Sequence, residues 1–289
     1  MSSKSRVLGP RTETSRLGDR RSGSWQVPRR GSQQRKHGVQ LGPFMVKLLR
    51  MAKRKCPLKL EEHTVSDAAL GYSRPIHLLR GPADQPHRLC LFLDGELYLQ
   101  KMKVLPVLQA LLDRQALPAA TFAFIDHLNL EARQQDYTCN GQFSRFIVEK
   151  VLPWLQQMIP SLQPDHHFIG GLSLSGLASA WLALQYPGHF RSCLSQSGSF
   201  WWNDEQFSKM ASLRAPLTNR FWLSVGDQET EVDEPPEVSQ IVGVKHAHRV
   251  LGTLGATVHY HEYHGGHDLK YWRQELDEAL PWLLAGTND

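Results

Sequence analysis

The sequence has few cysteines and no long apolar run, and each shortage excludes a class of protein. Its four cysteines in 289 residues lie far apart without a CxxC pair, so neither a zinc knuckle nor a disulfide framework is indicated. A reducing, cytoplasmic compartment is therefore expected. A membrane helix needs about 18 consecutive apolar residues. The longest such run, Ala116 to Ile125, carries Pro118 and Thr121 and has the length of a strand, so no membrane span is predicted.

Acidic residues are scarce over residues 1–55, where 15 lysines and arginines stand against two acids. This segment carries a charge of +13, whereas the remainder, with 18 basic and 26 acidic residues, carries −8. Residues 1–40 contain almost no periodic apolar residue and are expected to be disordered. We interpret residues 1–56 as a solvated basic extension. The alternatives are a transit peptide or an arm for nucleic acid or anionic membranes, and incidental weak nucleic-acid binding is all that we expect of it.

Beyond residue 57, apolar runs of strand length alternate with stretches of helical periodicity. Strands are predicted at Leu60–Val65, Arg74–Leu79, Leu89–Leu93, Thr121–Ile125, His167–Ile169, around Cys193-Leu194, at Arg220–Val225 and at Thr257–Tyr263. Helices are predicted at Val104–Leu112, Phe143–Met158, Gly176–Gln185, Val238–Leu254 and Tyr271–Leu284. The alternation predicts one α/β domain over residues 57–289, with a mostly parallel sheet covered by helices on both faces.

The most informative segment, residues 168–177, consists of a short apolar strand, a turn of small residues and the start of a helix. A sharp strand-to-helix turn brings backbone segments close together, and Gly171, Ser173 and Ser175 are small enough for it. Ser173 lies at the tip, as the serine of a nucleophile elbow does. The N–H of Leu174, at the start of the helix, would then face a developing oxyanion. The alternative is a helix cap in which the hydroxyls bind free N–H groups.

A serine nucleophile needs a base, and a histidine-rich segment later in the chain can supply one. His267 follows the predicted strand Thr257–Tyr263 and a glycine pair, so it falls in the loop before the last helix. Between the serine and this histidine, another predicted strand leads into a loop with three carboxylates, Asp227, Glu229 and Glu231. The chain order of serine, acid and histidine is that of α/β-hydrolases.

The same histidine-rich segment raises the question of a metal site. His261 to His264 looks like a zinc-protease helix motif, but its histidines are three residues apart instead of four and the segment is predicted to be a strand. A site built from His259, His261, His264 and His267 stays open as an alternative. We predict no metal and no cofactor.

The second donor of an oxyanion hole should come from a loop that follows an earlier strand. Asp94-Gly95-Glu96 ends the apolar run Leu89–Leu93, and Gly95 allows a close approach of the backbone. We therefore predict that the N–H groups of the Gly95–Glu96 loop complete the oxyanion hole with that of Leu174.

From about residue 57 to its end, the sequence resembles the enterochelin esterase branch of the esterase D superfamily, whose members have the α/β-hydrolase fold. The matching segments are Leu93–Glu96 with the Val107-Leu108 helix, Ile125-Asp126, Arg133 with Cys139-Asn140 and Phe143, the elbow, Leu194–Trp202, and Gly265–Asp268 before Trp272-Arg273. Together these segments are far more specific than any one of them.

The resemblance implies roles for individual residues. The elbow serine and the histidine of the Gly-Gly-His-Asp segment are catalytic in this family, which corresponds to Ser173 and His267. The family's Gly-x-x-Glu after the penultimate core strand corresponds to Gly226–Glu229, so Glu229 is preferred as the acid and Asp227 is the alternative. In such an enzyme, the side chains that line the acyl or catechol pocket would be Arg133, Trp201 and Trp202.

The resemblance implies a serine ester hydrolase that cleaves a siderophore-type lactone or another small or aromatic acyl ester through an acyl-enzyme. Two departures bear on this expectation: Ser175 replaces the usual glycine of the elbow, and the family's separate N-terminal domain, associated with ferric siderophores, has no recognisable counterpart. One alternative is a catalytically silent binding protein with a hydrolase fold. Another is an esterase D type hydrolase for a different ester or thioester. A nucleic-acid-binding protein is a third, supported only by the basic extension.

Overall fold

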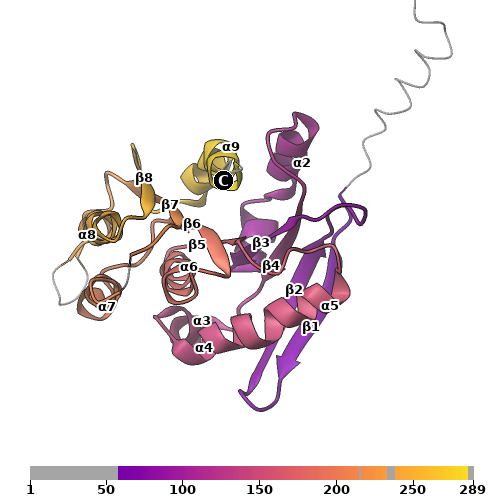
Figure 1. Cartoon of the computed structure of the whole chain (residues 1–289). Helices are drawn as coiled ribbons and strands as arrows, with labels where there is room; N and C mark the ends of the chain where they lie inside the picture. The colour runs from indigo at the N-terminus through magenta and orange to yellow at the C-terminus, as the bar shows by residue number, and fades with distance from the viewer. Residues whose placement is uncertain (1–57, 215, 233–237, 286–289) are drawn as a thin grey trace, which may run out of the picture. The chain divides into compact units, whose positions relative to one another are not determined.

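The computed structural model describes residues 58–214, 216–232 and 238–285, all within one compact unit, Cys56–Asp289. The predicted basic extension, residues 1–56, lies outside the described residues. Eight strands of the described part form one sheet in the order β1-β2-β4-β3-β5-β6-β7-β8 (Figure 1). β2 pairs antiparallel with β1 and β4, and all other neighbours are parallel. The α/β-hydrolase fold predicted from the sequence is confirmed.

All eight predicted strands are present, and their ends lie within three residues of the predicted ones. Their bounds are β1 Glu61–Asp67, β2 Tyr72–Leu79, β3 Arg88–Leu93, β4 Ala120–Ile125, β5 His167–Leu172, β6 Phe190–Gln196, β7 Arg220–Gly226 and β8 Thr257–Tyr263. β4 and β5 are buried along their whole length, as expected of central parallel strands that helices cover on both faces. The edge strand β8 is only partly buried.

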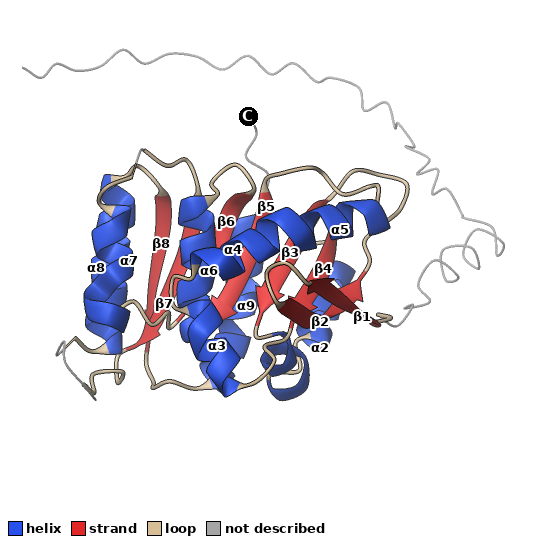
Figure 2. Ribbon diagram, turned by 90° about the horizontal axis from the view of Figure 1, so that it is seen from below, coloured by secondary structure: helices blue, strands red, loops and turns tan. Residues whose placement is uncertain are grey.

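The helices lie on both faces of the sheet. They are η1 Leu97–Lys101, α2 Leu105–Asp113, α3 Leu130–Tyr137, α4 Gly141–Arg145, η2 Phe146–Val151, α5 Leu152–Met158, α6 Leu174–Gln185, α7 Trp202–Ala211, α8 Gln240–Thr253 and α9 Leu269–Leu284. Figures 1 and 2 show α2 and α9 on one face and α3 to α8 on the other. Each face has its own apolar core, one rich in residues of α6 and α8 and one in residues of α2 and α9.

Four helical segments differ from the sequence prediction, and one of them is η1, five residues long, which was not predicted. The predicted helix Phe143–Met158 is a continuous helical run made of α4, η2 and α5, and Pro153, which has no N–H to donate, lies just after the wider turns of η2. Helices α3 and α7 were not predicted, because both are mostly polar and lack an apolar period. Within the described residues, no helix is long and apolar enough to cross a bilayer.

Candidate active site

Ser173 occupies the turn between β5 and α6 in a conformation that few residues adopt. Its φ of 54° and ψ of −123° lie outside the ordinary allowed regions, which marks stored backbone strain. The turn is tight, because a Cβ placed on Gly171 would lie 2.3 Å from the carbonyl oxygen of Ser175. This strained strand-to-helix turn has the form of a nucleophile elbow.

Ser175, which stands where the elbow usually has glycine, is fully buried. Its Oγ accepts a hydrogen bond from the Leu172 N–H at 2.8 Å and donates one to the Leu172 carbonyl oxygen at 2.7 Å. The Ser175 hydroxyl is thus bound to the end of β5, away from solvent. The next residue, Gly176, packs closely against Gly198, because a Cβ on Gly176 would lie 3.1 Å from Gly198 Cα.

His267, in the loop between β8 and α9, contacts Glu229, in the loop after β7. Its Nδ1 lies 2.6 Å from Glu229 Oε2, with 3% of the carboxylate side chain exposed and 43% of the imidazole side chain. A carboxylate that accepts from Nδ1–H leaves Nε2 as the basic nitrogen, the tautomer that a general base requires. The sequence-predicted serine, acid and histidine therefore all follow the carboxyl ends of parallel strands, β5, β7 and β8.

The other oxygen of the Glu229 carboxylate is held by three donors. Oε1 accepts from Ser197 Oγ and the Gly226 N–H at 2.7 Å each, and from Tyr263 Oη at 3.0 Å. Burial raises the pKa of Glu229, but the hydrogen bonds from His267, Ser197 and Gly226 outweigh it and hold the pKa below the usual range. Glu229 therefore stays ionised beside the imidazole.

Trp272 extends this network from α9. Its Nε1 donates to Ser197 Oγ and to Tyr263 Oη, each at 3.0 Å, and its ring meets that of His267 edge-on at 4.7 Å. The sequence analysis did not single out Ser197, Tyr263 or the function of Trp272. Only the matched segments Leu194–Trp202 and Trp272-Arg273 pointed to this region.

We expect Ser197→Ala to move the acid limb of the profile of folding stability against pH, measured by chemical denaturation, to higher pH. The substitution removes a donor from Glu229 and so raises the lowered pKa of that carboxyl, which then takes up its proton at higher pH. The pKa of Glu229 is lower in the folded protein than in the unfolded chain, so its ionisation stabilises the fold at pH values above the pKa of the unfolded chain. The variant should therefore also lose about 1–3 kcal/mol of stability at neutral pH, and less in acid.

The matched control for Ser197→Ala is Ser195→Ala, two residues earlier and within β6, whose buried Oγ has no hydrogen-bond partner among the described residues. The profile of Ser195→Ala should keep the acid limb of the unsubstituted protein. An acid limb that stays in place in Ser197→Ala would show that Ser197 does not tune Glu229.

The other two carboxylates of this loop lie elsewhere. Asp227 Oδ2 is 2.9 Å from His264 Nδ1, and its Oδ1 accepts from the Gly265 N–H at 3.0 Å. Glu231 lines the pocket. Of the three carboxylates, it is Glu229 that contacts His267.

A pocket of about 730 Å³ opens beside the serine and the histidine. Its lining is Gln134, Ser173, Ser199, Trp201, Trp202, Gln228, Glu229, Glu231, Val238, Gln240, Gly266 and His267. The two tryptophans that were predicted to line a pocket do so, with ring centroids 5.6 Å apart, and Trp201 Nε1 donates to Gln240 Oε1 at 2.5 Å. An aromatic wall beside amide groups suits a flat acyl group with polar substituents.

Arg133 does not belong to this lining. It projects from α3 to the Asp94 carboxylate, with Nε 3.0 Å from each oxygen and one terminal nitrogen 2.6 Å from Oδ2. Only 15% of its side chain is exposed. The neighbouring Gln134 faces the pocket instead.

The loop after β3, predicted to supply oxyanion donors, is tightly packed. A Cβ on Gly95 would lie 2.7 Å from Asp126 Oδ1 and 2.8 Å from the carbonyl carbon of Phe124, so this position needs glycine. The Asp94 carbonyl accepts from the Leu97 N–H at 2.9 Å, which turns the chain into η1. Leu174, the other predicted donor, is the first residue of α6, where a helix leaves N–H groups without intrahelical partners.

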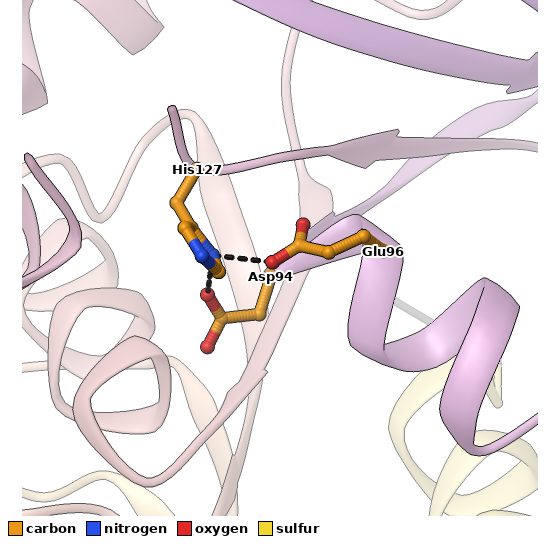
Figure 3. Close-up of side chains that lie close together, drawn as sticks. All are labelled: Asp94, Glu96 and His127. Carbon is orange, nitrogen blue, oxygen red and sulfur yellow. Dashed lines mark hydrogen bonds and ion pairs between the residues drawn. The ribbon is translucent and has the colours of Figure 1, made fainter. Parts of the chain in front are cut away.

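Asp94, Glu96 and His127 form a cluster behind this loop (Figure 3). His127 Nδ1 lies 3.0 Å from Asp94 Oδ1 and pairs with Glu96 Oε1. The three side chains are of the type that binds divalent cations. However, both Asp94 oxygens already accept hydrogen bonds from Arg133, so this carboxylate already has a cation partner.

The histidines considered for a metal site have separate partners. His259 stacks on Trp222 at 3.9 Å, and His261 lies 3.4 Å from Glu275 Oε2. His264 and His267 contact different carboxylates, as described above. The geometry gives each of the four histidines a side-chain partner of its own.

Comparison with known proteins identifies the family of this chain. The Esterase family model, described as "Putative esterase", matches residues 71–283. The chain belongs to the Esterase family. Iron(III) enterobactin esterase of Dickeya dadantii (strain 3937) is 32% identical over 72% of this chain and 49% of that protein, and the corresponding protein of Escherichia coli (strain K12) is 30% identical over 66% and 48%. The chain thus spans about half the length of these curated relatives.

Solved structures of other esterases resemble this chain. The enterochelin esterase of Shigella flexneri superposes with a TM-score of 0.71 and 26% identity, covering 80% of this chain and 60% of that one. A ferulic acid esterase superposes with a TM-score of 0.64 at 14% identity, over 78% of this chain and 98% of that one, which reflects the fold alone. The predicted resemblance to the enterochelin esterase branch is confirmed.

Proposed function

We propose that this chain is a serine carboxylic-ester hydrolase in which Ser173, His267 and Glu229 form the catalytic triad. The observation that carries the proposal is the 2.6 Å contact of His267 Nδ1 with buried Glu229, beside a strained elbow serine in the same pocket. Kinship to esterases supports it. Fold alone would not, because the same fold carries many activities.

In the proposed reaction, His267 Nε2 removes the proton of Ser173 Oγ as that oxygen attacks the ester carbonyl. The Leu174 N–H and the N–H groups of the Gly95–Glu96 loop stabilise the negative oxygen of the tetrahedral intermediate. His267 then gives its proton to the leaving alcohol, and an acyl-enzyme remains. Water, activated by His267 in turn, hydrolyses the acyl-enzyme and regenerates the serine.

As substrate we propose a siderophore-type lactone or another small or aromatic acyl ester. The relatives named enterobactin and salmochelin esterases support a lactone. The pocket supports an aromatic acyl group, because Trp201 and Trp202 form a wall beside three glutamines, Gln134, Gln228 and Gln240. Arg133 is assigned no direct substrate contact here, since it is bound to Asp94.

The alternative of a catalytically silent binding protein rested on Ser175 and on the choice of acid. Ser175 is accommodated by its hydrogen bonds to Leu172, and Glu229 reaches His267, so neither feature argues against catalysis. An esterase D type hydrolase for another ester or thioester stays the second candidate, because the pocket of about 730 Å³ admits acyl groups of several sizes.

We also propose the cytoplasm as the compartment of this protein. Cys90, Cys139 and Cys193 are buried free thiols, which a reducing compartment preserves. Weak nucleic-acid binding by residues 1–56 stays a prediction from their charge, with an affinity that should fall steeply as salt rises.

The function is tested with a panel of p-nitrophenyl esters beside iron-free and ferric catechol lactones and a matched thioester. The account predicts hydrolysis that saturates with substrate, with the highest kcat/KM on an aromatic or lactone ester. A preference for the thioester would favour the second candidate. No turnover of any member by the folded protein would refute the assignment as a hydrolase.

A further inference from the structure

The loop that carries the proposed oxyanion donors is flanked by two acidic side chains, and this inference rests on the proposed function. Asp94 precedes Gly95 and Glu96 follows it, and both side chains turn toward His127 (Figure 3). His127 follows β4, which pairs in parallel with β3, so the imidazole comes from the neighbouring strand end. A single ring thus bridges both ends of the loop.

Asp94 is the fixed end of this bridge. Its side chain is fully buried, and Arg133 holds both carboxylate oxygens from α3. Its N–H donates to Tyr137 Oη at 3.2 Å, also on α3. Asp94 is therefore anchored whether or not His127 is present.

Glu96 is the end that depends on His127. Its side chain is 20% exposed, and the carboxylate oxygens are sealed from solvent. Among the described residues, His127 is the cation within ion-pair distance of Glu96. Burial raises the pKa of Glu96 to about 7, although its own backbone N–H and His127 both lower it, and the neighbouring carboxylates of Asp94 and Asp126 add to the rise.

We propose that His127 is a positioning residue that ties the side chain of Glu96 to anchored Asp94 and so fixes the Gly95–Glu96 loop for oxyanion binding. A buried carboxylate that loses its cation must either take up a proton or turn toward water. Turning Glu96 outward moves the backbone N–H groups of its loop. Oxyanion donors act only when they are aimed in advance at the negative oxygen, so a small displacement slows the chemical step.

The experiment compares His127→Ala, Glu96→Gln and the double variant, with kcat and KM measured separately on one p-nitrophenyl ester. His127→Ala should lower kcat about 10- to 100-fold, less than the loss of a whole oxyanion donor, while KM changes less than about threefold. In the Glu96→Gln background, where the side chain needs no cation, the same substitution should lower kcat less than about threefold. If His127 only supported the fold, His127→Ala would lower kcat by the same factor with Glu96 and with Gln at position 96.

His127→Gln, neutral but of similar size, serves if the alanine variant does not fold, and it should show the same loss of kcat. The matched control is His246→Ala, which removes a histidine–glutamate ion pair between α8 and α7 and should leave kcat unchanged. An unchanged kcat in His127→Ala and His127→Gln, or an equal loss in both Glu96 backgrounds, would overturn the inference. An unsubstituted protein without ester hydrolysis would instead refute the proposed function.

Discussion

Ser173→Ala is expected to lower kcat for ester hydrolysis by about 10⁴- to 10⁶-fold, because the substitution removes the attacking oxygen and leaves only binding and oxyanion stabilisation. The fold should persist, since alanine fills the same turn and no hydrogen bond of the Ser173 side chain supports the elbow among the described residues. Steady-state kinetics on a p-nitrophenyl ester measures the loss. A thermal melt by circular dichroism checks the fold.

Ser175→Ala is the matched control, two residues further along the same elbow. It should keep kcat within about tenfold and lose about 1 kcal/mol of stability, because it gives up the hydrogen bonds to Leu172 and not the nucleophile. The assignment of Ser173 as the nucleophile would be contradicted if the Ser173→Ala variant were fully active. It would also be contradicted if the Ser175→Ala variant lost as much activity as the Ser173→Ala variant.

Glu229→Gln is expected to lower kcat about 10³- to 10⁴-fold, the second largest effect predicted for this site. The amide is nearly the same size, but it cannot stabilise the imidazolium that forms in the transition state, and its NH₂ group favours the wrong tautomer of His267. Kinetics near neutral pH measures this loss.

Asp227→Asn and Glu231→Gln remove the same charge from the same loop and serve as controls. Asp227 is bound to His264 and Glu231 faces the pocket, so each should change kcat less than about tenfold. If Glu229→Gln is as active as these two, His267 works without a carboxylate partner and the site is a Ser–His dyad.

The sequence predicts the sheet well where burial dictates the pattern. β3 and β5 read as apolar runs because helices cover both of their faces, and β8 was predicted over the same residues, Thr257–Tyr263, that the structure gives it. α3 and α7 were missed for the opposite reason. Their sequences are mostly polar. The start of α3 is set by its N-cap residue Asn129, whose side-chain oxygen accepts a hydrogen bond from the Ala132 N–H.

The sequence predicts those residues of the site that lie in a recognisable local turn. A small-residue elbow indicates Ser173, and a glycine pair after a strand indicates His267, but the choice among Asp227, Glu229 and Glu231 depends on how the loop after β7 folds back onto β8. The donors around Glu229 come from the turn after β6, from β8 and from α9, far apart in the chain. Arg133 shows the same limit, because its partner Asp94 lies 39 residues earlier.

The most direct test of the central claim is to locate the covalent adduct that a fluorophosphonate probe forms with the protein. Intact mass followed by peptide mapping identifies the labelled residue, and a His267→Ala variant shows whether labelling needs the base. The account predicts one adduct per chain, on Ser173, that forms much more slowly without His267. An adduct on Ser175 or Ser199, or none on folded protein, would contradict it.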